Sequence, residues 1–311
     1  MDELSQEDQF RLSVLLAQDL KAIRIDESTQ ILHALTDQGE ASMPLHPNCR
    51  ADKYFRLVRE HLSGHALGSP GGYPVYLSRW TRHGQMESDN LSRLLLIGEP
   101  EAVVAVVHSP ALTDSLAAYA WWAMPTIENA RLMLAREAVA RGRMGTVLTE
   151  FLVEHLPFLQ EDHLAIMDTV AVLLHAGTLN AAQREAIWRR GKRQNSYYVA
   201  FLEMCPDDLP LPEAAATSAD TAFVEACIDI LNRPETQEVV IRTLDAIGRH
   251  FAGIAAEATP LGAVDRLARV DSSQVGSIFA RSTAIGSLMR RKIEPITAPI
   301  LADLASLRSA K

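Results

Sequence analysis

The side chains best able to do chemistry, ten histidines and three cysteines, have spacings that argue against a metal centre. His61 and His65 are four residues apart, a spacing that allows two imidazoles on one helical face to bind a metal ion. We expect the helix to end at residues 63–64, which would separate the pair. The cysteines form no CxxC pair and fit neither a zinc site nor a disulfide framework: Cys49, Cys205 and Cys227. We therefore predict no metal and no cofactor.

Motifs of the common enzyme classes are also missing from the sequence. The glycine-rich run at residues 64–72 lacks both the Gly-Lys-Ser/Thr of a phosphate loop and GxGxxG spacing, and no GxSxG nucleophile turn occurs. We predict that the protein is not an enzyme. One chemical alternative stays open, a site assembled from His65, Arg79 and His83.

Basic side chains gather at turns, where a partner could reach them. The run RRGKR at residues 189–193 combines positive charge with a glycine, and aromatic residues follow it. A second basic turn lies near residue 142, and the loop at residues 64–85 adds aromatic side chains. We predict that these basic and aromatic residues contact a protein partner, and RNA binding through residues 189–193 is the alternative. The residues are Tyr73, Tyr76, Arg79, Trp80, Arg141, Arg143, Arg189, Arg190, Lys192, Arg193 and Tyr197.

Composition limits where the protein works and what it binds. Thirty Lys and Arg residues against 39 Asp and Glu give a net charge of −9, which disfavours general binding to phosphate backbones. The acidic start MDELSQEDQF lacks the features of a secretory signal, so we expect a cytoplasmic protein. The longest apolar stretch, residues 94–124, is broken by charged residues and prolines, so we predict no membrane insertion.

The elements that must position these residues are mainly helical. We expect residues 1–63 to form a small α+β unit, with a helix, a three-stranded meander and a second helix. Residues 64–89 form a structured Gly/Pro-rich loop, residues 90–212 form helical hairpins, and residues 213–311 continue the array. Helices are expected at 91–97, 100–108, 113–124, 127–140, 146–156, 162–175, 180–190, 197–204, 221–231, 235–256, 261–269, 275–289 and 294–307.

A weak internal repeat favours a particular arrangement of these helices. The segment at residues 106–112 aligns with residues 173–179, and Trp121 aligns with Trp188, so the offset is 67 residues. Half of that offset is close to the length of a helical-hairpin repeat. We therefore predict a mainly α chain whose body is a HEAT-like α-solenoid, with an irregular helical bundle as the alternative.

Several segments resemble the DsrS family, soluble proteins encoded with the dissimilatory sulfite reductase genes of sulfur-oxidising bacteria. The resemblance covers residues 10–210 and is carried by AIRIDES, LSGHALGSPGGYPVYLSRWTRHGQM, LLLIGEPEAVVAVV, AWWAMP and GRMG. These segments are not catalytic motifs and identify no active-site residues. The resemblance implies a cytoplasmic accessory or regulatory role in the oxidation of stored sulfur. Given this pathway, a sulfur carrier that uses Cys205 stays open as an alternative.

Overall fold

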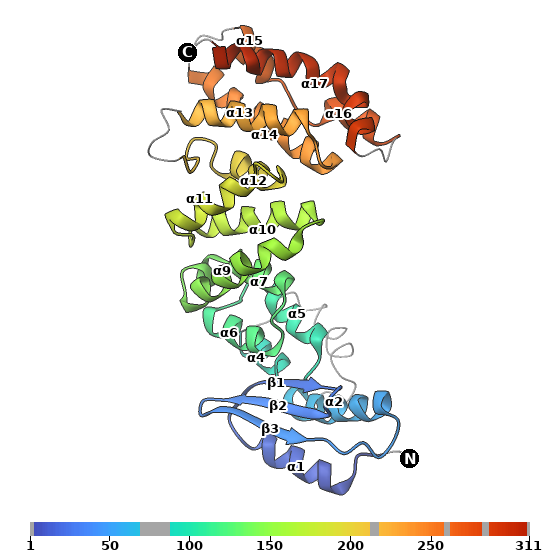
Figure 1. Ribbon diagram of the computed structural model, residues 1–311. Helices are drawn as coiled ribbons and strands as arrows, with labels where there is room; N and C mark the ends of the chain where they lie inside the picture. The colour runs from blue at the N-terminus through green and yellow to red at the C-terminus, as the bar shows by residue number, and fades with distance from the viewer. Residues whose placement is uncertain (1–2, 69–87, 212–217, 258–261, 282–285, 310–311) are drawn as a thin grey trace. The chain divides into compact units, whose positions relative to one another are not determined.

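The computed structural model describes residues 3–68, 88–211, 218–257, 262–281 and 286–309 (Figure 1). The described residues are 68% helical and include a three-stranded antiparallel sheet near the N-terminus, which confirms the predicted mainly α fold with a small α+β unit. It divides into two compact units, residues 1–148 and 149–311.

The first unit begins with the predicted helix, meander and helix. Helix α1 (Gln6–Leu16) starts at Ser5, whose hydroxyl accepts the backbone N–H of Asp8 at 3.1 Å. Strands β1 (Leu20–Asp26), β2 (Ile31–Thr36) and β3 (Gly39–Pro44) pair in sequence order, and α2 (Ala51–Leu67) follows. The expected end of α2 at residues 63–64 is wrong. Gly68 ends the helix instead, in the left-handed conformation with φ of 62°.

One face of the sheet forms an apolar core with α1 and α2, the helices drawn beside the strands in Figure 1. Within that core lies a fully buried carboxylate, Asp8. The Tyr54 hydroxyl donates to Asp8 Oδ2 at 2.6 Å and accepts the backbone N–H of His46 at 3.2 Å. Burial together with this carboxylate raises the pKa of Tyr54. The network ties α1 and α2 to the segment after β3, and it satisfies a charge that would otherwise be costly to bury.

The outer edge of β1 is covered by the segment that leads into the first helices of the body. The Ile23 N–H donates to the Leu95 carbonyl at 2.8 Å. At Gly98, where φ is 66°, a Cβ would lie only 2.9 Å from Ile25 Cδ1. This position therefore requires glycine, because it combines a left-handed backbone with close contact. On the outer face of the sheet, Trp122 Nε1 donates to Glu40 Oε2 at 3.1 Å, which attaches α6 to the strands.

The body of the first unit consists of α4 (Ser88–Leu94), α5 (Pro100–His108), α6 (Asp114–Ala123), α7 (Ile127–Leu134), α8 (Glu137–Ala140) and the start of α9 (Arg143–His155). The single helix expected at residues 127–140 is wrong. Arg136 adopts an extended conformation between α7 and α8, and its side chain donates to the His108 carbonyl at 2.9 Å. The chain therefore turns there without a glycine or a proline.

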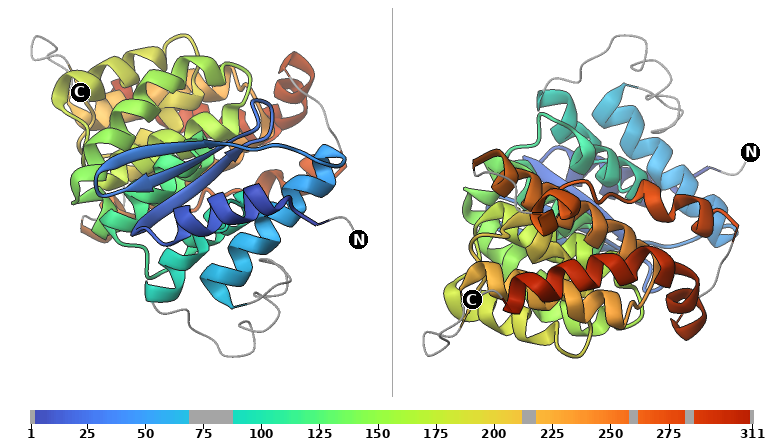
Figure 2. Two further views of the ribbon diagram at one scale, coloured as in Figure 1. Left: turned by 90° about the horizontal axis from the view of Figure 1, so that it is seen from below. Right: turned by 90° about the horizontal axis from the view of Figure 1, so that it is seen from above.

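The second unit contains η1 (Leu156–Leu159), α10 (His163–Ala176), α11 (Ala181–Arg190), α12 (Ser196–Met204), α13 (Ala219–Asn232), α14 (Gln237–Glu257), α15 (Gly262–Leu267), α16 (Ser273–Phe279) and α17 (Gly286–Ser309). Helix α12 packs between α10 and α14, while α17 packs against α13 and α15 (Figures 1 and 2). The helix expected at residues 275–289 is wrong. Helix α16 ends at Phe279. Helix α17 begins at Gly286 and includes the segment that was expected as a separate helix at residues 294–307.

The internal repeat is visible at the level of whole elements. Helix α6 (Asp114–Ala123) and helix α11 (Ala181–Arg190) have equal lengths and lie 67 positions apart. Each is capped in the same way, because the side chains of Thr113 and Asn180 accept the N–H of the third residue that follows. A continuous solenoid over both units stays a prediction.

The three central helices of the second unit are joined by one cation. The Arg242 guanidinium, on α14, donates through Nη1 to Asp168 of α10 at 2.8 Å and through Nε to Glu203 of α12 at 3.0 Å. The side chains of Arg242 and Glu203 are only 17% and 14% exposed. Removing one partner of such a pair leaves an uncompensated charge in a largely dehydrated site.

Replacement of Arg242 should therefore destabilise the second unit. We expect Arg242→Met to lower its free energy of unfolding by about 2–4 kcal/mol, because Glu203 loses its nearer and more buried counter-ion. Urea unfolding followed by circular dichroism measures this. The matched control is Arg249→Met, whose side chain is 62% exposed and which should change stability by less than about 1 kcal/mol. Equal effects of the two substitutions would contradict the role given to Arg242.

Replacement of two glycines of the first unit by alanine should change the stability of the unit in opposite directions. Gly98→Ala should destabilise the unit by about 1–2 kcal/mol, because alanine is strained at positive φ. Gly64 lies inside α2, and a Cβ there meets nothing within 4 Å. Gly64→Ala should therefore stabilise the unit by about 0.5–1 kcal/mol through helix propensity. The same unfolding measurement checks both, and a stabilising Gly98→Ala would refute the assigned constraint.

Candidate interaction surface

The basic turn that follows α11 is built around a glycine that the fold requires. Arg189 and Arg190 end α11, and Lys192 and Arg193 follow Gly191. Gly191 is buried, and a Cβ there would lie 2.3 Å from the ring of Tyr198. The turn therefore lies directly against α12, and residues 189–193 have a defined position.

Hydrogen bonds fix both sides of this turn. Gln194 Nε2 donates to the Gln160 carbonyl at 2.8 Å, and Asn195 Nδ2 donates to the Arg233 carbonyl at 2.8 Å. The Glu235 carboxylate accepts the N–H groups of Asn195 and Ser196, at 2.8 Å and 3.1 Å. A carboxylate is favourable there because the first N–H groups of α12 have no partner within the helix.

Two cations of the turn have no opposite charge at ion-pair distance among the described residues. Arg189 is 3.7 Å from Glu185, and the Arg190 guanidinium lies 5.9 Å from the centre of the Tyr197 ring. Lys192 and Arg193 are exposed, and within the described parts of the chain neither forms an ion pair. The turn is therefore a local positive site on a chain of net charge −9.

An exposed aromatic side chain lies on the segment beside this turn. Phe158, in η1, is 79% exposed, and Leu164 at the start of α10 is 50% exposed. The Phe158 ring contacts His155, which stacks on Phe151 with ring centroids 3.9 Å apart. The Tyr197 hydroxyl donates to the Leu156 carbonyl at 3.3 Å, and with the Gln194 contact this holds η1 next to the turn. We call Phe158, Leu164, Lys192 and Arg193 the basic-aromatic surface.

The other residues predicted to contact a partner lie in different surroundings. Tyr197 is 3% exposed and Tyr198 is 4% exposed, so neither ring is available to a partner in this structure. Arg141 is exposed and paired with Glu137, and both it and Arg143 belong to the first unit. The loop residues lie outside the described part of the chain: Tyr73, Tyr76, Arg79 and Trp80.

The candidate residues of the enzyme alternative are only partly described. Arg79 and His83 lie outside the described residues, and His65 is exposed on α2. Because α2 continues to Leu67, His61 and His65 share one helix after all. The described residues contain no group of three or more His, Cys, Asp or Glu side chains that could hold a metal ion.

A serine, a histidine and a glutamate meet at the start of α12, an arrangement that the sequence analysis missed. His163 Nδ1 lies 2.7 Å from Ser196 Oγ and 3.0 Å from Glu235 Oε2, and the Ser196 hydroxyl donates to Glu235 at 2.6 Å. In a catalytic triad the histidine uses different nitrogens for the serine and the acid, and the serine is accessible. Here one nitrogen contacts both residues, and Ser196 is fully buried. The group is a helix cap. Ser196 is 33 positions from His163 and 39 positions from Glu235 in the sequence, so a search for short motifs does not find the group.

Cys205 ends α12 in a half-buried position beside a cation. Arg184 Nη2 is 3.5 Å from its sulfur and also donates to the Asp208 carbonyl at 2.7 Å. Burial raises the pKa of the Cys205 thiol, although the Arg184 charge acts in the opposite direction. Sulfur transfer needs an accessible thiolate, so this environment disfavours the carrier alternative.

A scan of protein-family models and searches of curated proteins and solved structures gave no match to this chain. None of the described helices is long and apolar enough to cross a lipid bilayer.

The thiol environments predict an order of reactivity. We expect Cys205 to react with iodoacetamide at neutral pH more slowly than free N-acetylcysteine, because its raised pKa leaves less thiolate. Cys227 is fully buried and should react only after unfolding. Peptide mass spectrometry over a labelling time course measures both rates, with urea-unfolded protein as the control. Reaction of Cys205 faster than the free thiol would revive the carrier alternative.

Proposed function

We propose that this chain is a non-catalytic cytoplasmic accessory or regulatory protein of dissimilatory sulfur oxidation that works by binding another protein. The observation that carries the binding role is the basic-aromatic surface, where Lys192 and Arg193 have no opposite charge close by among the described residues and Phe158 is 79% exposed. The role in sulfur oxidation rests on the resemblance of residues 10–210 to the DsrS family.

The chemistry of the surface specifies the kind of partner. Two exposed cations, on a turn that contacts the segment of an exposed aromatic ring, complement a partner segment that carries carboxylates next to an apolar side chain. Protein interfaces are rich in aromatic and arginine anchors, and Phe158 and Arg193 are of those types. The hydrogen bonds that hold residues 194–196 and 156–160 fix the surface in advance, which lowers the entropy cost of binding.

Burial of Tyr197 and Tyr198 favours protein over RNA as the partner. Single-stranded nucleic acid is bound by stacking bases on exposed aromatic rings beside positive charge. Both tyrosine rings lie in the core, which leaves Phe158 as the exposed ring of this surface, and the net charge of −9 disfavours binding to phosphate backbones. RNA binding is therefore an outcome to be tested and not a second proposal.

Substitutions on the basic-aromatic surface should abolish partner binding. We expect full-length protein to capture a specific protein from a lysate of its own cells grown on reduced sulfur. The variants Phe158→Ser and Lys192→Glu/Arg193→Glu should each reduce capture by about tenfold or more, because they remove an apolar anchor or reverse two charges. Quantitative mass spectrometry of the captured proteins measures this.

The control changes the same amount of charge elsewhere in the second unit. Arg281→Glu/Arg291→Glu also reverses two exposed cations and should retain the partner. Capture of the same partner by all the surface variants would refute the assigned surface. Loss of capture after RNase treatment would establish the RNA alternative. Sulfite reductase genes beside the gene for this chain would support the pathway, and their absence would remove it while leaving the binding role to be judged by capture.

A further inference from the structure

The two edges of the sheet in the first unit differ in whether their backbone groups are paired. At the β1 edge, the Ile23 N–H donates to the Leu95 carbonyl at 2.8 Å, so the segment after α4 closes that edge. The opposite edge is formed by β3, which pairs with β2 alone (Figure 1). Unpaired N–H and C=O groups along a strand edge are a template for pairing with another strand.

The register of the hairpin identifies the backbone groups that β3 leaves unpaired. The Leu45 N–H donates to the Gln30 carbonyl at 2.8 Å, and bonded pairs alternate along an antiparallel ladder. The residues of β3 that bond to β2 are therefore Gly39, Ala41 and Met43. The N–H and C=O groups of Glu40 and Ser42 point away from β2, and both residues are exposed. Among the described residues, no backbone bond outside the hairpin involves either of them.

Strand β3 lacks the features that usually protect a free edge. Lysine side chains, internal prolines and β-bulges discourage pairing with another chain. Residues 39–44, GEASMP, contain no lysine or arginine, and they pair with β2 without a bulge. Pro44 is the last residue of the strand. The one charged side chain, Glu40, is already bound by Arg24 and by Trp122 Nε1, each at 3.1 Å. The β3 edge can therefore accept a further strand.

The sequence of β3 is complementary to itself in an antiparallel arrangement centred on Ala41. In that register Glu40 of one copy lies opposite Ser42 of the second copy, so like charges do not face each other. The two such pairs use all the outward N–H and C=O groups of Glu40 and Ser42, in four bonds. The small Ala41 side chain meets only its own copy at the two-fold axis. Met43 lies opposite Gly39 of the second copy, where a Cβ would meet nothing within 4 Å and a methionine has room.

We propose that the β3 edge binds a second copy of this chain, so that the two three-stranded sheets join into one continuous antiparallel sheet. The occupant is a second copy because the edge complements itself in backbone bonds, in charge and in side-chain size. Two strands of six residues bury little surface, so the dimer is weak, with a dissociation constant in the micromolar range. The pairing residues belong to the first unit and the basic-aromatic surface to the second, and each is tested by its own substitutions.

Sedimentation equilibrium of the full chain provides the first test. We expect the unmodified chain to dimerise reversibly at micromolar concentrations. Ser42→Pro removes one outward N–H from each copy, which is two of the four bonds, and should raise the dissociation constant at least about tenfold. The β2–β3 ladder does not use that N–H, so the circular dichroism spectrum should stay the same. A chain that is monomeric at every concentration, or a Ser42→Pro variant that dimerises as the unmodified chain does, would overturn the proposal.

Two further substitutions at the same position separate pairing from folding. Ser42→Thr keeps the N–H and should leave the dissociation constant within about twofold. Ser42→Glu also keeps the N–H but places a carboxylate opposite Glu40 of the second copy, and like charges opposite each other should weaken the dimer about tenfold. This variant tests the edge even where proline disturbs the fold. A Ser42→Glu dimer as tight as that of the unmodified chain would contradict the proposal.

Disulfide cross-linking tests the register, in a full chain that carries Cys49→Ser and Cys205→Ser. Ala41→Cys places two thiols directly opposite each other in a non-hydrogen-bonded pair, with Cα atoms about 4.5 Å apart, and diamide should link the copies. Ser42→Cys places its thiols on a diagonal about 7–8 Å apart and should cross-link at least about tenfold more slowly. Non-reducing gel electrophoresis over a time course measures both rates. Equal rates, or cross-linking of neither variant, would overturn the pairing centred on Ala41.

Discussion

The ion cluster of Arg242 with Asp168 and Glu203 is the contact on which the second unit depends. It fixes the positions of α10, α12 and α14 relative to one another, because a guanidinium has a rigid geometry and both acceptors must meet it. Apolar packing alone would tolerate small shifts between these helices. The start of α12, with its Glu235 cap, and the end of α12, beside His250, are both placed by this contact.

Much of the fold could be predicted from the sequence because local signals mark it. Pro100 begins α5, Gly177 ends α10, and Ser5, Thr113 and Asn180 cap helices at the expected places. The helix boundaries that were predicted wrongly lie where packing and contacts between distant residues determine the structure. Arg136 breaks a predicted helix without glycine or proline, and α2 passes through Gly64 because burial of Leu62 and Ala66 on either side outweighs the helix penalty of one glycine. Glu235, expected as the first residue of a helix, lies outside it and caps α12.

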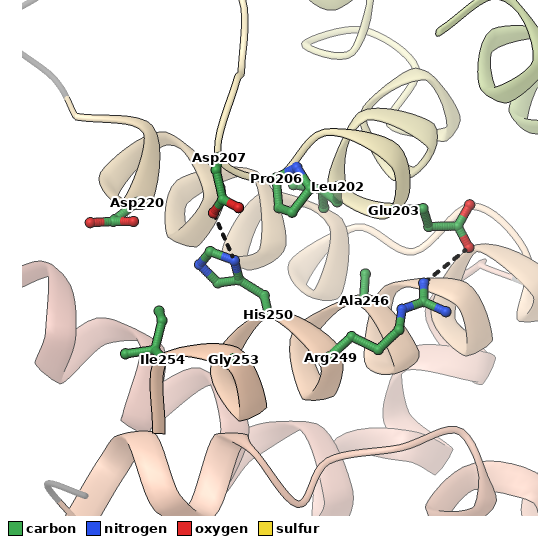
Figure 3. Close-up of a pocket in the computed structure, with 10 residues that line it drawn as sticks. All are labelled: Leu202, Glu203, Pro206, Asp207, Asp220, Ala246, Arg249, His250, Gly253 and Ile254. Carbon is green, nitrogen blue, oxygen red and sulfur yellow. Dashed lines mark ion pairs between the residues drawn. The ribbon is translucent and has the colours of Figure 1, made fainter. Parts of the chain in front are cut away.

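The candidate sites were predicted less completely, for the same physical reason. A run of cations such as residues 189–193 can be recognised in a sequence. The burial of Tyr197 cannot, because its hydroxyl donates a hydrogen bond to the carbonyl of Leu156, 41 residues away. Phe158 gave no signal, because a phenylalanine is expected in a core. Two cavities beside His250 are lined by residues of α12, α13, α14, α15 and α17, and no spacing rule relates Asp207, which lines one (Figure 3), to Leu307, which lines the other.

Helix α12 connects the basic turn to the segment beside His250. The basic turn precedes its first residue and the turn at residues 205–208 follows its last, so the nine residues of α12 separate the two turns by about 13 Å. Seven consecutive residues of this helix, Ser196 to Leu202, are buried, and Arg242 holds its last turn through Glu203. A helix enclosed in this way cannot bend or rotate without breaking the cluster. The basic turn is therefore held by the same helix that carries the ion cluster, and its position is set before any partner binds.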